Sequence, residues 1–562
     1  MSIRHQSLLL LLKEVYVLRL YRKFHSYMNL WTLLTFVIII LIIIPNLSIL
    51  MKFITEEAEN WPHIKEYILP ELLRNTSILL LTVGFLTILI GTSLAWLVAA
   101  YDFPLRKFFK WSLILPLSIP PYIAAYTYNG ILNYTGIVQT NLRNHFDLIL
   151  NPKYLDIMTM PGAIFIFTMF LFPYVYLVTR VFLYNQTAAL VENARLLGRN
   201  AFEIFVYIVL PISRVAIVGG VSLVLLEVLN DYGVVQYFGI PTFTTAIFQT
   251  WYGMGDLNAA IKLSATLMFI VFAILMLEKL LRGRKKYSYP VAKARKLSRT
   301  SLKGWKAIAA FLYCSIIFLL GFLIPFIQLI DWMLLTYRKV ADPVFRSLIM
   351  NSLFVSVTGA LLITIFAVIV VNFARMHPSA VPKTLARTTL LGYSIPGTVI
   401  AVGIITVFLA IDKFLFSFYE LMGMEPKLFL STSLLLLISA YTIRFLAVGF
   451  NAVEAGFEES GNKFMEASRT LGAGMTETFF KIDFPMIRGA VFGGFILAFI
   501  EILKELPLTL VLRPFNFDTL STKTFQYASD EQIPEAALAS LIIIGLSAVA
   551  IYVFYYLLDK EK

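Results

Sequence analysis

The chain has 562 residues, of which 59% are hydrophobic and 14% are charged, and its formal net charge is +13. Soluble domains carry about a quarter charged residues, so this composition excludes a soluble globular protein and indicates an integral membrane protein. The single cysteine, Cys314, excludes disulfides within the chain and cysteine-based metal or iron–sulfur sites. The five histidines are scattered without the spacing of metal ligands.

The first half of the sequence contains six apolar runs, each long enough to cross a membrane as a helix. We expect these helices at about 28–51, 75–101, 111–132, 162–184, 215–232 and 257–281. No small-residue cleavage site follows the first run, so it is interpreted as a helix and not as a removed signal peptide. Basic residues precede it, and five glutamates lie between Lys52 and Leu73. The positive-inside tendency therefore places the N-terminus in the cytoplasm and the acidic segment outside.

A basic segment separates this half from a second one. Residues 282–306 contain ten Lys or Arg and no acidic residue. In a soluble protein such a run would suggest nucleic acid, but between membrane helices it predicts a cytoplasmic linker attracted to anionic lipid. Six more apolar runs follow, at about 307–330, 351–375, 388–410, 428–450, 489–506 and 536–557. We predict an all-α membrane protein of about twelve helices, with both termini cytoplasmic and with domains 1–281, 282–306 and 307–562.

One polar stretch occurs in both halves, and its matching residues are always 274 positions apart. The two copies share Glu192, Arg195, Leu197, Gly198, Glu203, Ile208 and Pro211 with Glu466, Arg469, Leu471, Gly472, Glu477, Ile482 and Pro485. Shorter matches occur 276 positions apart, at Asn75 and Asn351 and at the Ser-Ile-Pro sequences that end at Pro120 and Pro396. The sequence is therefore an internal duplication of two six-helix halves. The halves must be parallel, because six helices return the chain to the face where it began.

Each copy of the polar stretch lies between two apolar runs, so it is expected to form a loop at one membrane face. Gly198 and Gly472 permit a turn, while Pro211 and Pro485 suit the first turn of the following helix. An ordinary loop is the alternative for a single copy. Two copies with one spacing favour a functional element.

The order of Glu, small residues, Gly and Ile-x-x-Pro in these loops resembles the signature of permease subunits of binding-protein-dependent ABC importers. The departures are Asn193 and Ser468, where Ala is usual, and Phe484, where Leu is usual. The resemblance implies the type I permease architecture and makes each loop a coupling helix in a groove of a separate ATPase, expected as a homodimer. It also implies a substrate-binding protein at the outer face of the bacterial inner membrane. The residues that carry these implied coupling roles are Glu192, Arg195, Gly198, Pro211, Glu466, Arg469, Gly472 and Pro485.

This chain has no convincing nucleotide-binding loop of its own. The nearest match, Gly456 to Lys463, has Asn462 where the phosphate-binding Lys should stand, and it follows a membrane helix and not a strand. We therefore expect a permease that is not itself an enzyme and that needs no cofactor. ATP and Mg would bind to the partner ATPase.

Two pairs of acidic residues follow the polar loops at equivalent positions. Glu227 and Asp231 match Glu501 and Glu505, and the i, i+4 spacing places each pair on one helix face. Glu227 lies about 24 Å along the helix from Pro211, in the outer half of the membrane. A carboxylate at mid-bilayer costs about 2.5–3.5 kcal/mol, so four matched carboxylates are not expected to face lipid.

Two interpretations of these carboxylates remain open. In the first, they have a structural role and either pair with Lys504 or other basic residues or sit hydrated at the outer mouth. In the second, they line the path of a cation as transient oxygen ligands. In the second interpretation Glu227 and Glu501 lie deeper, and Asp231 and Glu505 lie nearer the mouth.

The segments Asp231–Asp256 and Lys504–Glu531 resemble the fused two-repeat permeases of ferric-ion ABC importers, which implies ferric iron as the cargo. Thiamine and phosphonate permeases share the architecture, and the acidic residues favour a cation over phosphonate. Two other classes of function are the alternatives. A secondary transporter with an acidic ion site would need no coupling loops, and a membrane enzyme would need a nucleophile and base or a metal cluster.

Pro120 and Pro396 each interrupt an expected membrane helix at an equivalent position. A proline inside a helix removes a backbone hydrogen bond and kinks it. The pair is predicted to form hinges between inward- and outward-facing states, and static kinks that aid packing are the alternative.

Overall fold

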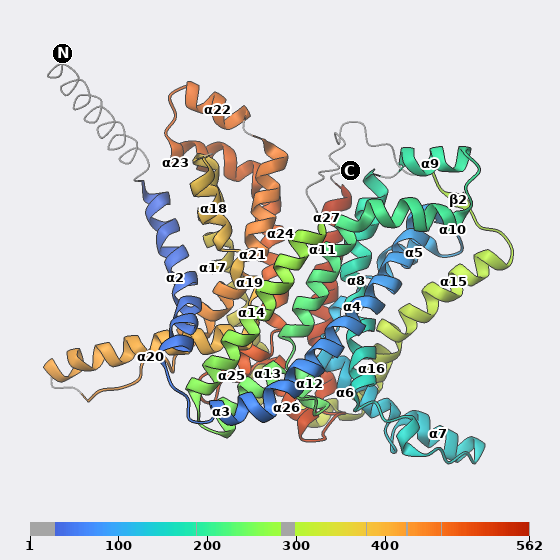
Figure 1. Ribbon diagram of the computed structural model, residues 1–562, viewed down its shortest axis with the longest axis horizontal. Helices are drawn as coiled ribbons and strands as arrows, with labels where there is room; N and C mark the ends of the chain where they lie inside the picture. Colours follow the sequence, from blue (N-terminus) through green and yellow to red (C-terminus); the bar gives the residue numbers. More distant parts are fainter. Residues whose placement is uncertain are drawn as a thin grey trace. The chain divides into compact units, whose positions relative to one another are not determined.

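The computed structural model describes residues 29–186, 188–282, 298–377, 379–422, 425–461 and 463–560. Within them, eleven helical segments are long and apolar enough to cross a membrane. A twelfth is present if Arg106–Ser118 and Pro121–Phe146, which are bent by 93° at their junction, count as one span. The prediction of about twelve membrane helices is confirmed (Figure 1). The helical form satisfies each backbone N–H and C=O within its own segment, as the bilayer core requires.

The described part of the first half contains long helices joined by short helical turns. Its elements are α2 (Leu30–Thr55), α3 (Trp61–His63), η1 (Ile64–Ile68), α4 (Leu69–Ala100), β1 (Tyr101–Asp102), α5 (Arg106–Ser112), η2 (Leu115–Ser118), α6 (Pro121–Leu132), α7 (Ile137–Phe146), η3 (Pro152–Tyr154), α8 (Met160–Gln186), α9 (Ala188–Leu196), α10 (Ala201–Ile204), η4 (Phe205–Val209), α11 (Leu210–Asn230), α12 (Gly233–Tyr237), α13 (Phe243–Phe248), η5 (Gln249–Gly253) and α14 (Leu257–Arg282).

The second half repeats this pattern of long helices and short turns. Its elements are β2 (Thr300–Ser301), α15 (Trp305–Phe318), η7 (Leu319–Leu323), α16 (Ile324–Val340), α17 (Pro343–Met376), α18 (Ala380–Thr388), α19 (Leu391–Ser394), α20 (Gly397–Leu421), α21 (Leu434–Ser460), α22 (Lys463–Thr470), α23 (Met475–Thr478), η8 (Phe479–Asp483), α24 (Phe484–Leu503), α25 (Pro507–Leu512), α26 (Leu520–Ser529) and α27 (Ala536–Lys560). Most basic residues of the N-terminus and of the predicted linker lie outside the described residues.

Contacts divide the chain into two compact units. The smaller unit contains the described residues of Met1–Leu47, Ser356–Tyr393 and Ile438–Ile502. The larger unit contains Ser48–Val355, Ser394–Leu437 and Leu503–Lys562. These units follow packing and not sequence duplication, so the domain boundaries at 281 and 307 stay a prediction.

In the larger unit, α4, α8 and α11 pack closely because small residues let their backbones approach. A Cβ atom added to Gly91 on α4 would lie 2.8 Å from the Cβ of Val175 on α8. A Cβ added to Gly220 on α11 would lie 2.8 Å from the Cα of the same valine. Glycine is therefore required at both positions, as is usual where membrane helices approach without large side chains between them.

The duplication seen in the sequence reappears as matched hydrogen bonds in the larger unit. Asn75 Nδ2 donates to the carbonyl of Pro241 at 3.0 Å, and Asn351 Nδ2 donates to the carbonyl of Asp518 at 3.0 Å. Each asparagine thus ties the start of a long helix to the segment just before a short helix, α13 or α26. Equivalent residues make equivalent contacts, which confirms that the halves are structural repeats.

Candidate coupling loops and acidic residues

The first predicted coupling loop is a short helix that ends at a left-handed glycine. After α9, Gly198 has φ +78° and donates its N–H to Arg195 O at 3.0 Å, while Arg199 donates to Ala194 O at 3.1 Å. These two bonds satisfy carbonyls that the end of a helix leaves unpaired. Left-handed backbone is costly for residues with a Cβ, so the glycine is needed for this helix end.

The second predicted loop repeats this geometry in the smaller unit. Gly472 follows α22 with φ +91°, and its N–H bonds to Arg469 O at 3.1 Å. Ala473 donates to Ser468 O at 3.2 Å. The glycine that the sequence repeats is therefore a helix terminator in both halves.

Each loop then continues as a short helix, α10 or α23, and a π-helical turn leads from it into the next long helix. Asn200 caps α10 by accepting from Glu203 N at 2.8 Å, and the Glu203 carboxylate accepts from Asn200 N at 3.2 Å. This reciprocal capping box is specific to the first copy. In the second copy Gly474 precedes α23 and has no capping side chain, and Glu477 forms an ion pair of 2.8 Å with Lys481. The π-helical turns η4 and η8 follow, and Pro211 and Pro485 are the second residues of α11 and α24. Each proline lies inside a continuous helix, Ala201–Asn230 or Met475–Leu503, and the π-helical turn before it is where the backbone bonding adjusts to the N–H that proline lacks.

Both loops expose a leucine at the equivalent position. Leu197 is 83% exposed and Leu471 is 87% exposed. Each stands beside the terminating glycine, where an added Cβ would meet no atom within 4 Å. A single exposed leucine is ordinary, but its recurrence at equivalent positions is consistent with one partner surface shared by both loops.

The two loops differ in what holds them. In the larger unit, Arg195 Nη1 donates to Ser298 O at 3.1 Å, and the adjoining strand β2 pairs in parallel with β1. The end of the linker therefore contacts the first loop. In the smaller unit, the Trp31 ring on α2 lies 4.8 Å from that of Phe479, and its Nε1 donates to Thr476 Oγ1 at 3.2 Å.

An arginine that the sequence analysis missed joins both ends of the second loop. Arg375, at the end of α17, forms an ion pair of 2.8 Å with Asp483 and donates to Gly461 O at 3.1 Å. Its guanidinium also lies 4.5 Å from the ring centroid of Phe457. Comparison of the two repeats could have revealed it, because the charged Asp483 stands where the first repeat has the apolar Val209.

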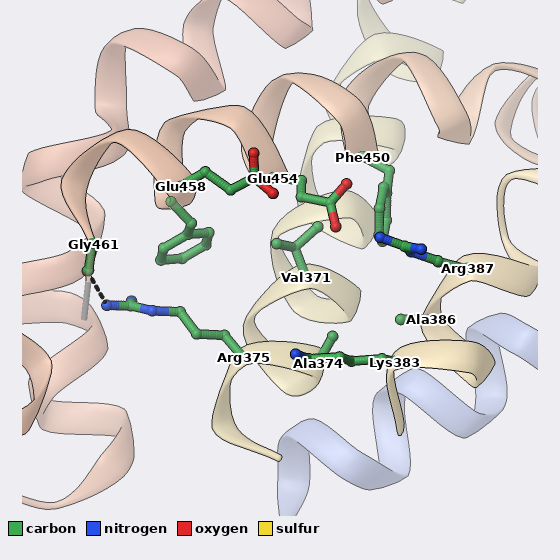
Figure 2. Close-up of a pocket in the computed structure, with 11 residues that line it drawn as sticks. Val371, Ala374, Arg375, Lys383, Ala386, Arg387, Phe450, Glu454, Glu458 and Gly461 are labelled. Carbon is green, nitrogen blue, oxygen red and sulfur yellow. Dashed lines mark hydrogen bonds between the residues drawn. The ribbon is translucent and has the colours of Figure 1, made fainter. Parts of the chain in front are cut away.

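A cavity of about 330 Å³ lies beside this arginine in the smaller unit. Figure 2 shows Arg375, Lys383 and Arg387 on one side of it, with Glu454 and Glu458 of α21 on the other. The dashed bond in that view joins Arg375 to Gly461. At this level the cavity lies between α21 and the helices α17 and α18, with acidic side chains on the α21 side and basic side chains on the other.

The predicted acidic residues lie at the far ends of α11 and α24 from the coupling loops. Asp231 Oδ1 accepts from Val234 N at 2.8 Å, and Glu505 Oε1 accepts from Leu508 N at 3.0 Å. These are matched bonds, and each begins a short helix, α12 or α25. In Figure 1 both short helices lie at the end of the larger unit opposite α9 and α10.

Three of the four carboxylates belong to the larger unit and are close enough to interact. The charge of Asp231 is repelled by those of Glu227 and Glu505. The Tyr122 hydroxyl, near Asp231 and Glu505, is buried and has no hydrogen-bond partner among the described residues. Glu501 is half-buried in the smaller unit. Across the described residues, no three His, Cys, Asp or Glu side chains are grouped so that they could hold a metal ion.

Pro120 and Pro396 stand at breaks between helices and not at kinks within them. Pro120 has an extended conformation, with φ −56° and ψ 139°, between η2 and α6. Pro396 occupies the equivalent gap between α19 and α20. In the second break, Gly397 N donates to Asn230 Oδ1 at 2.7 Å, which ties the start of α20 to the end of α11.

Comparison with known proteins matches both repeats to one family. The family described as "Binding-protein-dependent transport system inner membrane component" matches residues 88–278 and 359–562. The Fe(3+)-transport system permease protein FbpB 2 of Haemophilus influenzae is 27% identical over 86% of this chain and 89% of its own length. The ferric transport system permease protein FbpB of Actinobacillus pleuropneumoniae is 20% identical over 78% of this chain and 64% of its own length. The sulfate transport system permease protein CysW of Escherichia coli is 24% identical over 35% of this chain and 68% of its own length.

Proposed function

The chain belongs to the family of inner membrane components of binding-protein-dependent transport systems, and we propose that it carries ferric iron across the membrane. Family membership and the many spanning helices make it the multi-pass permease subunit of an ABC importer. The substrate, the partner subunits and the orientation of the termini belong to the proposal.

The cargo assignment rests on the extent of similarity to ferric permeases. The match to the Haemophilus protein spans 86% of the chain and includes both repeats, whereas the sulfate permease matches 35%. The acidic residues support the same choice, because the carboxyl groups of Glu227, Asp231 and Glu505 lie close enough to interact in the larger unit. Carboxylate oxygens suit a hard cation and repel an anion such as sulfate or phosphonate.

The coupling loops supply the link to ATP hydrolysis. We assign each loop to a groove in one subunit of a homodimeric ATPase, with ATP and Mg bound there. The matched geometry and the exposed leucines Leu197 and Leu471 support this assignment. A secondary transporter would not need two such surfaces. A substrate-binding protein would deliver the cargo to the opposite face, near α12 and α25, and both termini would be cytoplasmic.

Reconstitution of the complete transporter tests this function. The permease, its ATPase and its binding protein would be placed in proteoliposomes, and uptake of radioactive ferric iron would be compared with that of thiamine, a phosphonate and sulfate. ATP-dependent uptake of iron alone is expected. ATP-dependent uptake of another solute without iron would overturn the cargo assignment, and uptake that needs no ATPase would overturn the coupling assignment.

A further inference from the structure

Arg375 contacts the segments on both sides of the second coupling helix. Gly461 lies just before α22, and Asp483 lies at the end of η8, after the loop has returned. The arginine reaches both, with an ion pair of 2.8 Å to Asp483 and a hydrogen bond of 3.1 Å to Gly461 O. One side chain of α17 therefore fixes the start and the end of the loop together.

The ion pair is shielded from water, which makes it a firm connection. The side chains of Arg375 and Asp483 are only 9% and 5% exposed. Exposed ion pairs contribute little, whereas removing one partner of a buried pair is strongly destabilising because a charge stays behind uncompensated. The cavity next to Arg375 separates α21 from α17 and α18 at the same level (Figure 2). The arginine therefore bridges a region where the helices themselves are not tightly packed.

In the described part of the first repeat, the positions that match Arg375 and Asp483 carry no charge. On the matching helix, Ala99 occupies the place of Arg375, 276 positions earlier, as Asn75 does for Asn351. Val209 occupies the place of Asp483, and both Ala99 and Val209 are buried. The first loop is held instead by apolar packing and by the bond from Arg195 to Ser298. The two loops are thus alike at their terminating glycines and differ in the contacts that hold their ends to the membrane helices.

We propose that Arg375 is a positioning residue that makes the second coupling helix and α17 move as one body, so that ATPase motion at this loop is passed to the membrane helix. This inference rests on the proposed coupling role of the loops. A direct ion pair with a backbone contact transmits displacement in a way that an open cavity does not. The contacts of Arg375 with Asp483 and Gly461 thus make coupling in the second repeat depend on one side chain.

Two variants separate this role from simple stability. Asp483→Asn keeps the size of the side chain and leaves Arg375 its bond to Gly461. Arg375→Ala with Asp483→Val copies the residues of the first repeat and leaves no buried charge, so it should fold and insert even if the single variant does not. Asp102→Asn is the control for removing an ion pair whose carboxylate is more exposed, 53% against 5% for Asp483. It removes an ion pair of 2.9 Å to Arg106, which keeps its own bond to Val98 O at 2.9 Å.

The measured quantity is the number of ATP molecules hydrolysed per cargo molecule taken up in proteoliposomes, together with co-purification of the ATPase. We expect the ATPase to co-purify with the double variant, and this ratio to rise about fivefold or more, the lower end of typical coupling between sites. The Asp102→Asn ratio should equal that of the unaltered protein. A double variant with an unchanged ratio would overturn the inference and leave the proposed function intact. An unaltered permease that binds no ATPase would instead overturn the proposed function.

Discussion

Asp231 and Glu505 occupy equivalent positions in the two repeats and make the same bond. Each carboxylate accepts the N–H of the third residue after it, at 2.8 Å and 3.0 Å. The backbone also uses them alike, because Thr244 Oγ1 donates to Asp231 O and Ser521 Oγ donates to Glu505 O, both at 2.8 Å. These carboxylates therefore begin short helices, in addition to any role toward a cation.

The two roles of Asp231 can be separated by substitution. Asp231→Asn keeps a hydrogen-bond acceptor and removes the charge, whereas Asp231→Ala removes both. Loss of a helix cap costs about 1 kcal/mol, so the alanine variant should unfold at lower temperature and the asparagine variant should not. If the charge also attracts the cargo, iron uptake should fall in both variants. Normal uptake by a stable Asp231→Asn protein would show that the carboxylate serves the fold alone.

The deeper pair of carboxylates is expected to matter for transport. Glu227→Gln with Glu501→Gln keeps side-chain size and removes two negative charges from the proposed path. Iron uptake should fall about tenfold, which corresponds to about 1.4 kcal/mol, while binding-protein docking is unchanged. Glu59→Gln, at an exposed position outside the spanning helices, is the control. Full uptake by the double variant would remove both residues from the path.

The exposed leucines should bind the ATPase. Leu197→Ser with Leu471→Ser changes side chains that are almost fully exposed, so the stability of the isolated permease should change by less than about 0.5 kcal/mol. A residue that acts as a hot spot at the centre of an interface costs about 2 kcal/mol or more when it is truncated. Co-purification of the ATPase should therefore be lost in the double variant. An ATPase that still binds fully would place the contact elsewhere on the loops.

The glycines that end the two coupling helices offer a related test. Gly198→Asn with Gly472→Asn and the corresponding Asp variants add side chains of equal size to open space. Asparagine and aspartate both tolerate left-handed backbone, so the Asn variant measures the cost of shape. The Asp variant adds negative charge at a helix C-terminus, which is unfavourable. We expect weaker ATPase binding with Asp than with Asn. Equal binding by both variants would contradict a charge-sensitive surface.

The helix breaks at Pro120 and Pro396 are expected to act in transport. Replacing both with alanine supplies a backbone N–H and allows the helices on either side to join, so uptake should fall more than thermal stability. Pro173→Ala, inside the continuous helix α8, is the comparison. Equal proportional losses of uptake and stability in the double variant would favour breaks that serve only packing.

The sequence by itself determined the spanning helices, the duplication and the two loops. Apolar length alone locates a membrane helix, because a span needs about twenty residues without charge. The repeated Gly198 and Gly472 were visible because a left-handed turn strongly favours glycine, so the same residue stands at this position in both copies of the loop. The structure confirmed about twelve helices and matched contacts at Asn75 and Asn351.

Only the tertiary structure decided what the charged residues contact. Sequence spacing placed Asp231 and Glu505 on helix faces, yet their bonds begin new short helices. The mismatch of Asp483 with Val209 marks a charged residue, but it does not identify the partner Arg375, more than a hundred positions away, because helix periodicity describes neighbours within one segment. The proline positions were predicted as kinks, but the structure has breaks between helices there, and the backbone at Pro120 is extended. Long-range packing determines which distant residues contact each other, and the spacing of residues along the sequence does not reveal these contacts.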